Sequence, residues 1–335
     1  MSNILQELKL QRPGKDPIFK QLGIVSGFKP KELRKSMILL IGPTGCGKST
    51  VVASMGPRTF IFDFDKAHQD VPCSRASRVT PGVMINPETG EETICDAWEH
   101  FVLCMEWLKN GGRELYDTVV FDTVDQWIRL VDSALVAIVN KKRETAGAED
   151  QKDLLQSIVD LGQGGYKRLL DRLVIEWTSL SEKGYGLVFT GHLKRRKVKF
   201  AETGVERDVP CLGVYPSIED ALRRAADYVI KCIRGQEAIK TTTAQVHPRT
   251  GKKMGDITTT TQQRVVKLIF DERFENSELS TMETVKNRVE MPSEILIPEA
   301  ERHEAYEIIS AAHEKACIVQ AEKHKVHLSK IGESE

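Results

Sequence analysis

MILLIGPTGCGKST, residues 37–50, is the stretch that decides the fold. Its first five residues form an uninterrupted apolar run, which is typical of a strand buried on both faces of a sheet. Residues 42–49 match the pattern G-x-x-x-x-G-K-[ST], whose glycines let backbone N–H groups turn toward a phosphate. A helix predicted over 48–55 directs its positive end at the same anion. The stretch therefore predicts a strand, a phosphate-binding loop (P-loop) and a helix, in that order.

The side chains of this loop predict the bound nucleotide. Lys48 would reach the β- and γ-phosphates, and the hydroxyl of Ser49 would bind Mg²⁺. An Asn-Lys-x-Asp stretch that reads guanine is missing, because residues 140–143 read NKKR and lack the acid. We therefore expect ATP and Mg²⁺ as cofactors. The predicted nucleotide-binding residues are Gly42, Pro43, Thr44, Gly45, Cys46, Gly47, Lys48, Ser49 and Thr50.

Composition excludes several classes of protein. The 335 residues include 48 Lys and Arg and 48 Asp and Glu, so no global basic field marks a nucleic-acid-binding protein, and DNA contact would need a local patch. The seven cysteines are scattered and never in CxxC spacing, which favours reduced thiols over disulfides or a zinc site. No apolar run reaches the ~18 residues of a membrane span, and the N-terminus does not read as a secretory signal. We expect a cytoplasmic protein without a membrane partner.

Strand and helix patterns alternate from residue 37 onward. Further strands are predicted over 59–65, 116–122, 185–190, 227–233 and 265–270. Helices are predicted after residue 122, over 165–182, from 217 and over 298–325. One more helix is predicted over 94–108, with Thr93 and Asp96 as its capping box. Two β-hairpins are expected, at 197–209 with a turn at Thr203-Gly204, and within 235–263.

This alternation predicts an α/β P-loop fold. The expected architecture is a mainly parallel central sheet flanked by helices, with β-hairpin insertions and a C-terminal helix. Three parts are expected: an N-terminal extension over 1–35, an ATPase core over 36–297, and a C-terminal helix and tail over 298–335. Ligands would bind at the carboxyl ends of the parallel strands.

Carboxylates end two of the predicted strands. Asp122 lies at the tip of one, where it would hold Mg²⁺ through water; the alternative is a cap of the next helix, shared with Thr123 and Asp125. In the 59–65 strand, alternation places Asp63 and Asp65 on the face opposite three phenylalanines. Such carboxylates are costly to bury without partners. We interpret Asp65 as the base that activates water; a loop-capping role is the alternative, and the choice between Asp63 and Asp65 stays open.

Five features in sequence order resemble a known group. They are the P-loop, the F-D-x-D strand end at 62–65, the strand 116–122, Gly-Gly-Tyr at 164–166 and Thr-Gly-His at 190–192. Over residues 36–297 the chain resembles phage-encoded RecA-like ATPases, most closely the Sak-type single-strand annealing and recombination proteins. The resemblance implies a RecA-like fold and a catalytic carboxylate at Asp65, where the family usually has glutamate. It also implies that His192 senses the γ-phosphate; a histidine hydrogen-bonded at a strand terminus is the alternative.

A basic run follows His192 directly. It consists of Lys194, Arg195, Arg196, Lys197 and Lys199. In RecA-like proteins the loop after this strand contacts single-stranded DNA, and the resemblance implies the same here. Phosphate neutralisation by such a cluster is salt-dependent and tolerant of sequence. A solvated basic hairpin is the alternative.

A second basic element, Lys286-Asn287-Arg288, follows the last predicted core strand. It resembles the Lys-x-Arg element of RadA- and DnaB-like relatives, which reaches the ATP of a neighbouring subunit. The resemblance therefore implies catalytic roles for Lys286 and Arg288 and self-association into a ring or filament. Ordinary surface charges are the alternative.

Together these features predict an ATPase that acts on single-stranded DNA in phage recombination, annealing or replication, with a single-strand-binding protein as a further candidate partner. The catalytic set comprises Lys48, Asp65, Asp122, His192, Lys286 and Arg288, and the metal ligands are Ser49 and Asp122. Two alternatives remain: a P-loop nucleotide kinase, and a nucleotide-switched interaction protein that does not bind DNA.

Overall fold

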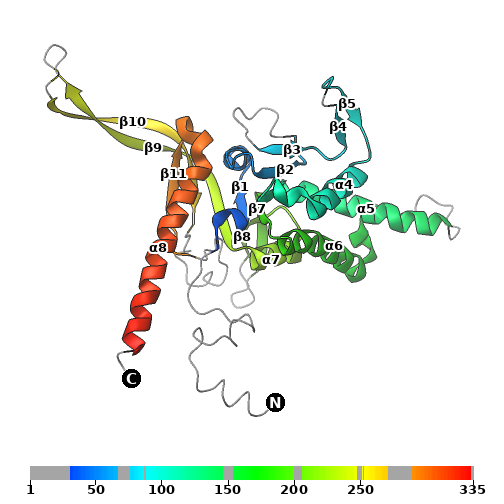
Figure 1. Cartoon of the computed structure of the whole chain (residues 1–335). Coiled ribbons are helices and arrows are strands. Elements are labelled where there is room, and N and C mark those ends of the chain that lie inside the picture. The colour runs from blue at the N-terminus through cyan, green and yellow to red at the C-terminus, as the bar shows by residue number, and fades with distance from the viewer. Residues whose placement is uncertain are drawn as a thin grey trace.

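A nine-stranded sheet forms the centre of the molecule (Figure 1). The structure is a computed structural model that describes residues 31–66, 76–86, 88–145, 154–199, 206–246, 251, 253–270 and 289–332. The sheet order is β11-β10-β9-β1-β7-β6-β2-β3, and β8 pairs with β7. Its strands are β1 (Met37–Gly42), β2 (Thr59–Asp63), β3 (Ser77–Val79), β6 (Thr118–Asp122), β7 (Gly186–Lys199), β8 (Glu206–Leu212), β9 (Tyr228–Val246), β10 (Lys253–Ile269) and β11 (Glu294–Pro298).

Most of the sheet is parallel. The pairs β1–β9, β1–β7, β7–β6, β6–β2 and β2–β3 are all parallel. The strands β10 and β11 add an antiparallel edge. The predicted fold class, an α/β P-loop fold with a mainly parallel sheet and hairpin insertions, is confirmed. Parallel strands point the same way, so their carboxyl ends meet at one edge of the sheet. This edge is formed by the ends of β1, β2 and β6 and by the ends of the parallel parts of β7 and β9.

Helices cover both faces of this sheet. They are α3 (Lys48–Ala53), α4 (Ala97–Asn110), α5 (Val124–Thr145), α6 (Gln163–Glu182), α7 (Pro216–Ala225) and α8 (Ala305–Gly332). Short 3₁₀ segments are η1 (Leu33–Lys35), η3 (Gly112–Glu114), η5 (Ile158–Leu161) and η7 (Glu299–Glu304), and a separate two-stranded sheet joins β4 (Val83–Ile85) to β5 (Glu92–Ile94). None of the helices in the described ranges is long and apolar enough to cross a membrane.

Each face of the sheet has its own apolar core. Leu39 and Ile41 of β1 belong to the core under α4, α5, α6 and α7, whereas Leu40 belongs to the core under α3 and α8. The same alternation divides β2, where Phe62 packs with the first core and Ile61 with the second. The predicted division of this strand into two faces is confirmed, because successive side chains of a strand point to opposite sides.

The start of α4 differs from the prediction. Thr93 belongs to β5, where it pairs with Met84, so it cannot cap a helix. Asp96 is the cap instead: its side chain accepts a hydrogen bond from the backbone N–H of Glu99 at 2.8 Å. The capping-box prediction failed because strand pairing holds residues 92–94 in an extended conformation until two residues before the cap.

The strand β7 extends well past its predicted end. It continues to Lys199 and pairs antiparallel with β8, from Leu193 opposite Leu212 to Lys199 opposite Glu206. The predicted hairpin therefore exists but begins earlier, and its predicted turn at Thr203-Gly204 lies outside the described residues. The basic run consequently lies on a strand, and its prediction as a loop was wrong. Hydrogen bonds to β8 stabilise this additional part of β7, and such cross-strand bonds leave no local pattern in the sequence.

The strands β9 and β10 extend beyond the sheet as a long two-stranded arm (Figure 1). The register of β9 with β10 runs from Lys231 opposite Ile269 to Val246 opposite Lys253. Within the described residues, β1 accompanies β9 only as far as Lys231, and β11 accompanies β10 only from Val265. The predicted hairpin within 235–263 is confirmed. The predicted strand 265–270 is the last part of β10, and β11 was not predicted.

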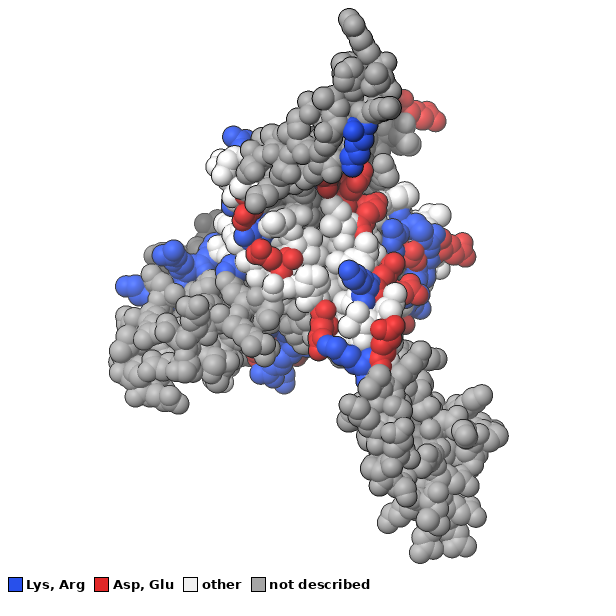
Figure 2. All heavy atoms as spheres, turned by 90° about the vertical axis from the view of Figure 1, so that its left-hand side faces the viewer, with Lys and Arg blue, Asp and Glu red and all other residues white. Residues whose placement is uncertain are grey.

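The C-terminal helix packs on the α3 side of the sheet. The backbone N–H of Tyr306 donates to Ser54 Oγ at 3.0 Å, and Tyr228 Oη lies 2.8 Å from His313 Nε2. These buried contacts join α8 to α3 and β9. Figure 2 shows acidic and basic side chains interspersed on the described part of the face at the left of Figure 1, in keeping with equal numbers of the two.

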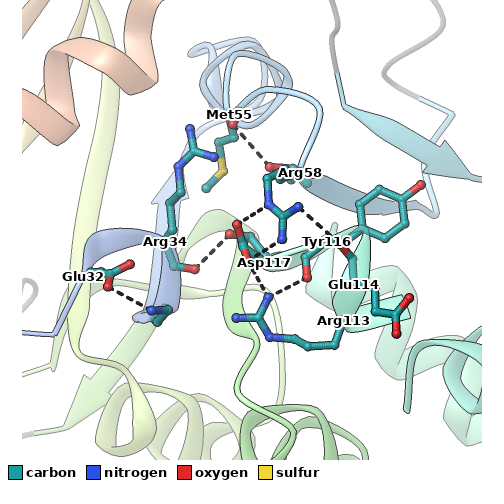
Figure 3. A network of polar contacts seen from close by, with 11 residues as sticks. Glu32, Arg34, Met55, Arg58, Arg113, Glu114, Tyr116 and Asp117 are labelled. Atoms are coloured by element: carbon teal, nitrogen blue, oxygen red, sulfur yellow. Dashed lines mark hydrogen bonds and ion pairs between the residues drawn. The ribbon is translucent and has the colours of Figure 1, made fainter. Parts of the chain in front are cut away.

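A polar network ties the opposite, amino-terminal edge of the sheet together (Figure 3). Asp117, just before β6, accepts hydrogen bonds from Arg58 Nε at 2.6 Å and Nη2 at 3.0 Å, and a further one from Arg113. Arg113 also donates to the carbonyl of Tyr116 at 2.9 Å. The guanidinium groups hold the pKa of Asp117 well below its usual range, Arg58 contributing most. This network links the starts of β2 and β6 at the edge away from the P-loop.

Candidate functional site

The P-loop closes tightly against the sheet at two of its glycines. A Cβ on Gly42 would lie 2.2 Å from the carbonyl oxygen of Cys232, so only glycine fits there. Gly47 has a φ of 103° in the left-handed region, and a Cβ on it would lie 2.8 Å from Val266 Cγ2. The glycines of the sequence pattern are therefore required by close contacts with β9 and β10, and they bring those strands beside the loop.

Lys48 is buried at the start of α3, inside the loop. Its Nζ donates to the carbonyl oxygens of Gly42 at 3.0 Å and Pro43 at 2.9 Å. Gly47 precedes the helix without a side-chain cap, so backbone N–H groups at this end remain available to an anion. An ammonium and a helix start thus lie together where a phosphate group would enter.

The loop also contains a thiol next to a second thiol. Cys232 Sγ of β9 donates to the carbonyl oxygen of Cys46 at 3.2 Å, and both cysteines are buried. A hydrogen bond from the Cys232 thiol, together with the charge of Lys48, lowers the pKa of Cys46 to about 7. These contacts add to the packing of β9 against the P-loop.

Asp122 is held between two hydroxyl groups. Ser49 Oγ of α3 donates to Asp122 Oδ2 at 2.9 Å, and Thr190 Oγ1 of β7 donates to Asp122 Oδ1. The carboxylate is fully buried at the end of β6. Thr190 was not singled out from the sequence, although it belongs to the Thr-Gly-His strand end that was.

This oxygen set fits a magnesium ion. Mg²⁺ prefers hard oxygen ligands and is usually held by one or two protein groups together with phosphates and waters. Ser49 Oγ and the Asp122 carboxylate supply such oxygens beside the P-loop. Within the described ranges no group of three or more His, Cys, Asp or Glu side chains could hold a metal ion.

Asp65 faces the pocket beside the P-loop, whereas Asp63 does not line it. Thr123 Oγ1 donates to Asp65 Oδ2 at 3.0 Å. Burial raises the pKa of Asp65, and the charges of Asp125 and Asp122 raise it further. Asp63 is fully buried within β2. The two carboxylates left open by the sequence therefore differ in their access to the pocket.

His192 completes this side of the pocket. It lies opposite Gly42 in the β1–β7 register, next to the first residue of the P-loop. Its Nδ1 is 3.5 Å from Asp125 Oδ1. The imidazole therefore lies between the P-loop and the start of α5.

One pocket of about 750 Å³ collects these groups. It is lined by Thr44, Gly45, Gly47, Lys48, Ser49, Thr50, Asp65, Thr123, His192, Arg234, Arg264, Val265, Val266, Glu299 and Arg302. Its volume suits a nucleotide-sized ligand. Residues from all along the chain, from the P-loop to η7, meet here.

Four charged residues of this lining were not predicted: Arg234, Arg264, Glu299 and Arg302. Arg234 directly follows the predicted strand 227–233, so its position at the carboxyl end of that strand could have been predicted from the sequence. No local sequence pattern marks the other three as pocket residues, because the pairing of β10 and the packing of η7 bring them to the pocket. Conversely, the basic run 194–197 does not line the pocket, and Lys286 and Arg288 lie outside the described residues.

A family model described as an AAA domain matches residues 34–271. The chain belongs to this AAA domain family. The match spans the P-loop, every strand from β1 to β10 and the carboxylates of the pocket. Together with the P-loop sequence, the AAA domain makes this chain a P-loop ATPase. No curated protein matches the chain significantly.

Solved structures resemble the AAA domain only distantly. One is the RadB recombinase, with 11% identity, a TM-score of 0.30, and coverage of 67% of this chain and 86% of that chain. Another is the KaiC-like protein PH0186 from the archaeon Pyrococcus horikoshii OT3, with 12% identity, a TM-score of 0.32, and coverage of 69% and 86%.

Proposed function

We propose that the chain hydrolyses Mg²⁺-bound ATP and does so on single-stranded DNA. The observation that carries the first part is the convergence on one pocket of the P-loop lysine, the Ser49–Asp122 pair and the Asp65 carboxylate. Phosphoryl transfer needs a phosphate cradle, a place for the metal and a group that orients or deprotonates water. Lys48, the Ser49–Asp122 pair and Asp65 are the residues that we assign to these three tasks.

The residues divide the chemistry among themselves. Bound Mg²⁺ would supply positive charge to the β- and γ-phosphate oxygens. Lys48 binds the same oxygens from inside the loop and neutralises the charge that grows as the bond from the γ-phosphorus to the bridging oxygen breaks. Asp65 accepts the proton of the water whose oxygen bonds to that phosphorus. Burial raises the pKa of Asp65, which makes its carboxylate a stronger base than that of an exposed aspartate.

Positioning groups support each of these residues. The hydrogen bond from Thr123 holds Oδ2 of Asp65, a residue that lines the pocket. The bond from Thr190 holds Asp122 while Ser49 contacts its other oxygen. His192 lies where it would sense whether a γ-phosphate is present, and its contact with Asp125 would pass that state to the start of α5.

The basic strand supports the DNA part of the proposal. Lys194, Arg195 and Lys197 are exposed on β7 just beyond the point where the strand leaves the pocket. Because His192 and this run belong to one continuous strand, nucleotide state and DNA contact share an element. The resemblance to Sak-type phage proteins supports a role in recombination, annealing or replication, and ring or filament assembly through Lys286 and Arg288.

ATP turnover with and without single-stranded DNA tests this function. We expect stimulation by DNA, and loss of nucleotide binding and turnover in Lys48→Ala, whose missing ammonium is the main side-chain charge on the phosphates. A phosphorylated nucleotide as product would identify a kinase. Slow turnover indifferent to DNA would identify a nucleotide-switched interaction protein.

A further inference from the structure

The wall of the pocket formed by β9, β10 and η7 is basic. It carries Arg234 at the base of the β9–β10 arm, Arg264 on the paired strand and Arg302 in η7, with Glu299 as its acid. Three guanidinium groups and one carboxylate give this wall a formal charge of +2. The other acid of the pocket lining, Asp65, lies beyond the end of β2 and is not part of this wall.

This wall lies directly against the P-loop. Val266, two residues after Arg264, approaches Gly47 so closely that a Cβ on the glycine would lie 2.8 Å from it. The 3₁₀ segment η7 contacts α3, the helix that begins with Lys48. The arginines are therefore in the same chain and the same pocket as the phosphate-binding loop, without help from a second subunit.

Glu299 holds two of these arginines. Arg234 Nη2 donates to Glu299 Oε1 at 2.9 Å, and Arg302 Nη1 lies 4.0 Å from the same oxygen. All three side chains are partly exposed, with 52%, 38% and 42% of the side-chain surface accessible for Arg234, Glu299 and Arg302. Ion pairs of this exposure contribute little to stability. No carboxylate pairs with Arg264 in the part of the chain that the structure describes.

A polyphosphate is a stronger partner for guanidinium groups than one exposed carboxylate. Guanidinium groups bind phosphate oxygens through two parallel N–H···O bonds, and charge-assisted bonds of this kind are about twice as strong as neutral ones. We propose that Arg234 and Arg302 bind the phosphates of the nucleotide in cis, exchanging Glu299 for phosphate oxygens. Glu299 thereby competes with the nucleotide and lowers its affinity. The inference rests on the proposed nucleotide site and extends it to a second, previously unassigned set of phosphate-binding residues.

The test measures binding of Mg-ATP and of magnesium tripolyphosphate to the full chain by calorimetry at low ionic strength. We expect Arg234→Gln and Arg302→Gln each to weaken both ligands by about tenfold. Glu299→Gln should strengthen both by a few-fold, because the competitor is removed. This opposite sign separates the proposal from damage to the fold, which would weaken binding in all three variants.

Arg224→Gln is the matched control. Arg224 on α7 pairs with Asp220 at 2.6 Å, is 79% exposed and does not line the pocket, so its replacement removes the same charge elsewhere. The proposal is overturned if Arg234→Gln and Arg302→Gln behave like this control, or if Glu299→Gln weakens binding. Weaker binding of ATP with unchanged binding of tripolyphosphate also overturns it, since the arginines would then contact the nucleoside.

Lys48→Ala separates this inference from the proposed function. If Lys48→Ala loses both ligands while the arginine variants keep them, the P-loop site stands and only the cis arginines fail. If Lys48→Ala binds both ligands with unchanged affinity, the nucleotide site itself lies elsewhere and both proposals fail.

Discussion

Two carboxylates near the carboxyl ends of neighbouring strands have different surroundings. Asp122 is fully buried and bonded by Ser49 and Thr190, so it is fixed in place. Asp65 accepts a hydrogen bond from Thr123 and faces the pocket. A fixed carboxylate suits a metal site, and a partly exposed one with a raised pKa suits proton transfer.

Asp65→Asn is therefore expected to keep ATP binding and to slow turnover by about 10²–10⁴-fold, because an amide cannot take a proton from water. Binding is measured by calorimetry and turnover by phosphate release. Asp63→Asn is the comparison: Asp63 is buried within β2, so its change should lower the melting temperature more than the turnover of the folded protein. Loss of turnover in folded Asp63→Asn, with Asp65→Asn active, would assign the base to Asp63.

A second residue-scale prediction concerns Asp117 in the network of Figure 3. Asp117→Asn should lower the free energy of unfolding by about 1–2 kcal/mol, since charge-assisted bonds from Arg58 and Arg113 lose their acceptor charge. The pKa of Asp117 is lowered in the folded state. Its contribution is therefore present above the unfolded pKa of about 4 and declines as pH falls below it.

Urea unfolding at several pH values checks this. The difference between wild type and Asp117→Asn should be constant near neutral pH and should shrink below about pH 4. Glu32→Gln is the control, because Glu32 pairs with Lys35 on the exposed surface and should change stability by less than about 0.5 kcal/mol. A difference that is unaffected by acid would show that Asp117 acts through packing rather than charge.

At the scale of elements, the basic strand of β7 has two unequal faces. Arg195 and Lys197 are two residues apart, so their side chains point to the same face of the strand, and both are exposed. Arg196, on the other face, donates to the carbonyl of Val214 at 2.8 Å and lies 3.7 Å from Glu219. Arg196 thus ties the hairpin to α7, and DNA contact is expected mainly from the exposed face.

Replacing Arg195 and Lys197 together with glutamine should weaken single-stranded DNA binding without changing the melting temperature. The slope of log affinity against log salt should fall by about 0.7 for each DNA phosphate that the protein no longer neutralises. Fluorescence anisotropy across a salt series measures both the affinity and the slope. Lys141→Gln/Lys142→Gln, an equal charge change at the exposed end of α5, should leave the slope as in wild type. If the control pair changes the slope and the strand pair does not, DNA binds elsewhere.

At the scale of the whole molecule, the pocket joins the two halves of the sheet. Asp65 after β2, Thr123 after β6 and His192 of β7 line one side, while β9, β10 and η7 bring arginines. Arg234, which lines the pocket, is part of the strand β9 that continues into the arm. Assembly through Lys286 and Arg288 would add a further cation from a neighbour.

A mixing experiment tests that assembly. Arg288→Ala and Asp65→Asn subunits should each be inactive. The first lacks the arginine that would reach the ATP of a neighbouring subunit (an arginine finger), which is worth about 10³–10⁵ in rate, and the second lacks the base. Mixed at equal ratio, about a quarter of head-to-tail interfaces would combine an intact base with an intact finger, so turnover should rise toward a quarter of wild type. Phosphate release is measured across mixing ratios. Variants that co-assemble yet stay inactive at every ratio would exclude action in trans.

Local patterns in the sequence determined the P-loop and the sheet around it. The apolar run 37–41 followed by glycines at fixed spacing predicted β1, the loop and α3, and alternation in 59–65 predicted the two faces of β2. These predictions held because each depends on residues within one or two turns of chain. The position of Asp122 at the end of β6 could be predicted for the same reason, since a strand end can be read from a single segment.

Tertiary structure alone decided the rest. It placed Asp65 on the pocket and Asp63 inside β2, placed Thr93 in a strand, extended β7 through the basic run and brought Arg234 to Glu299, 65 residues away in the chain. Each of these depends on pairing between distant segments, whose hydrogen bonds and ion pairs impose no period on the sequence. A periodic pattern records which face of an element is buried, but the partner across that face is set only when the whole sheet has assembled.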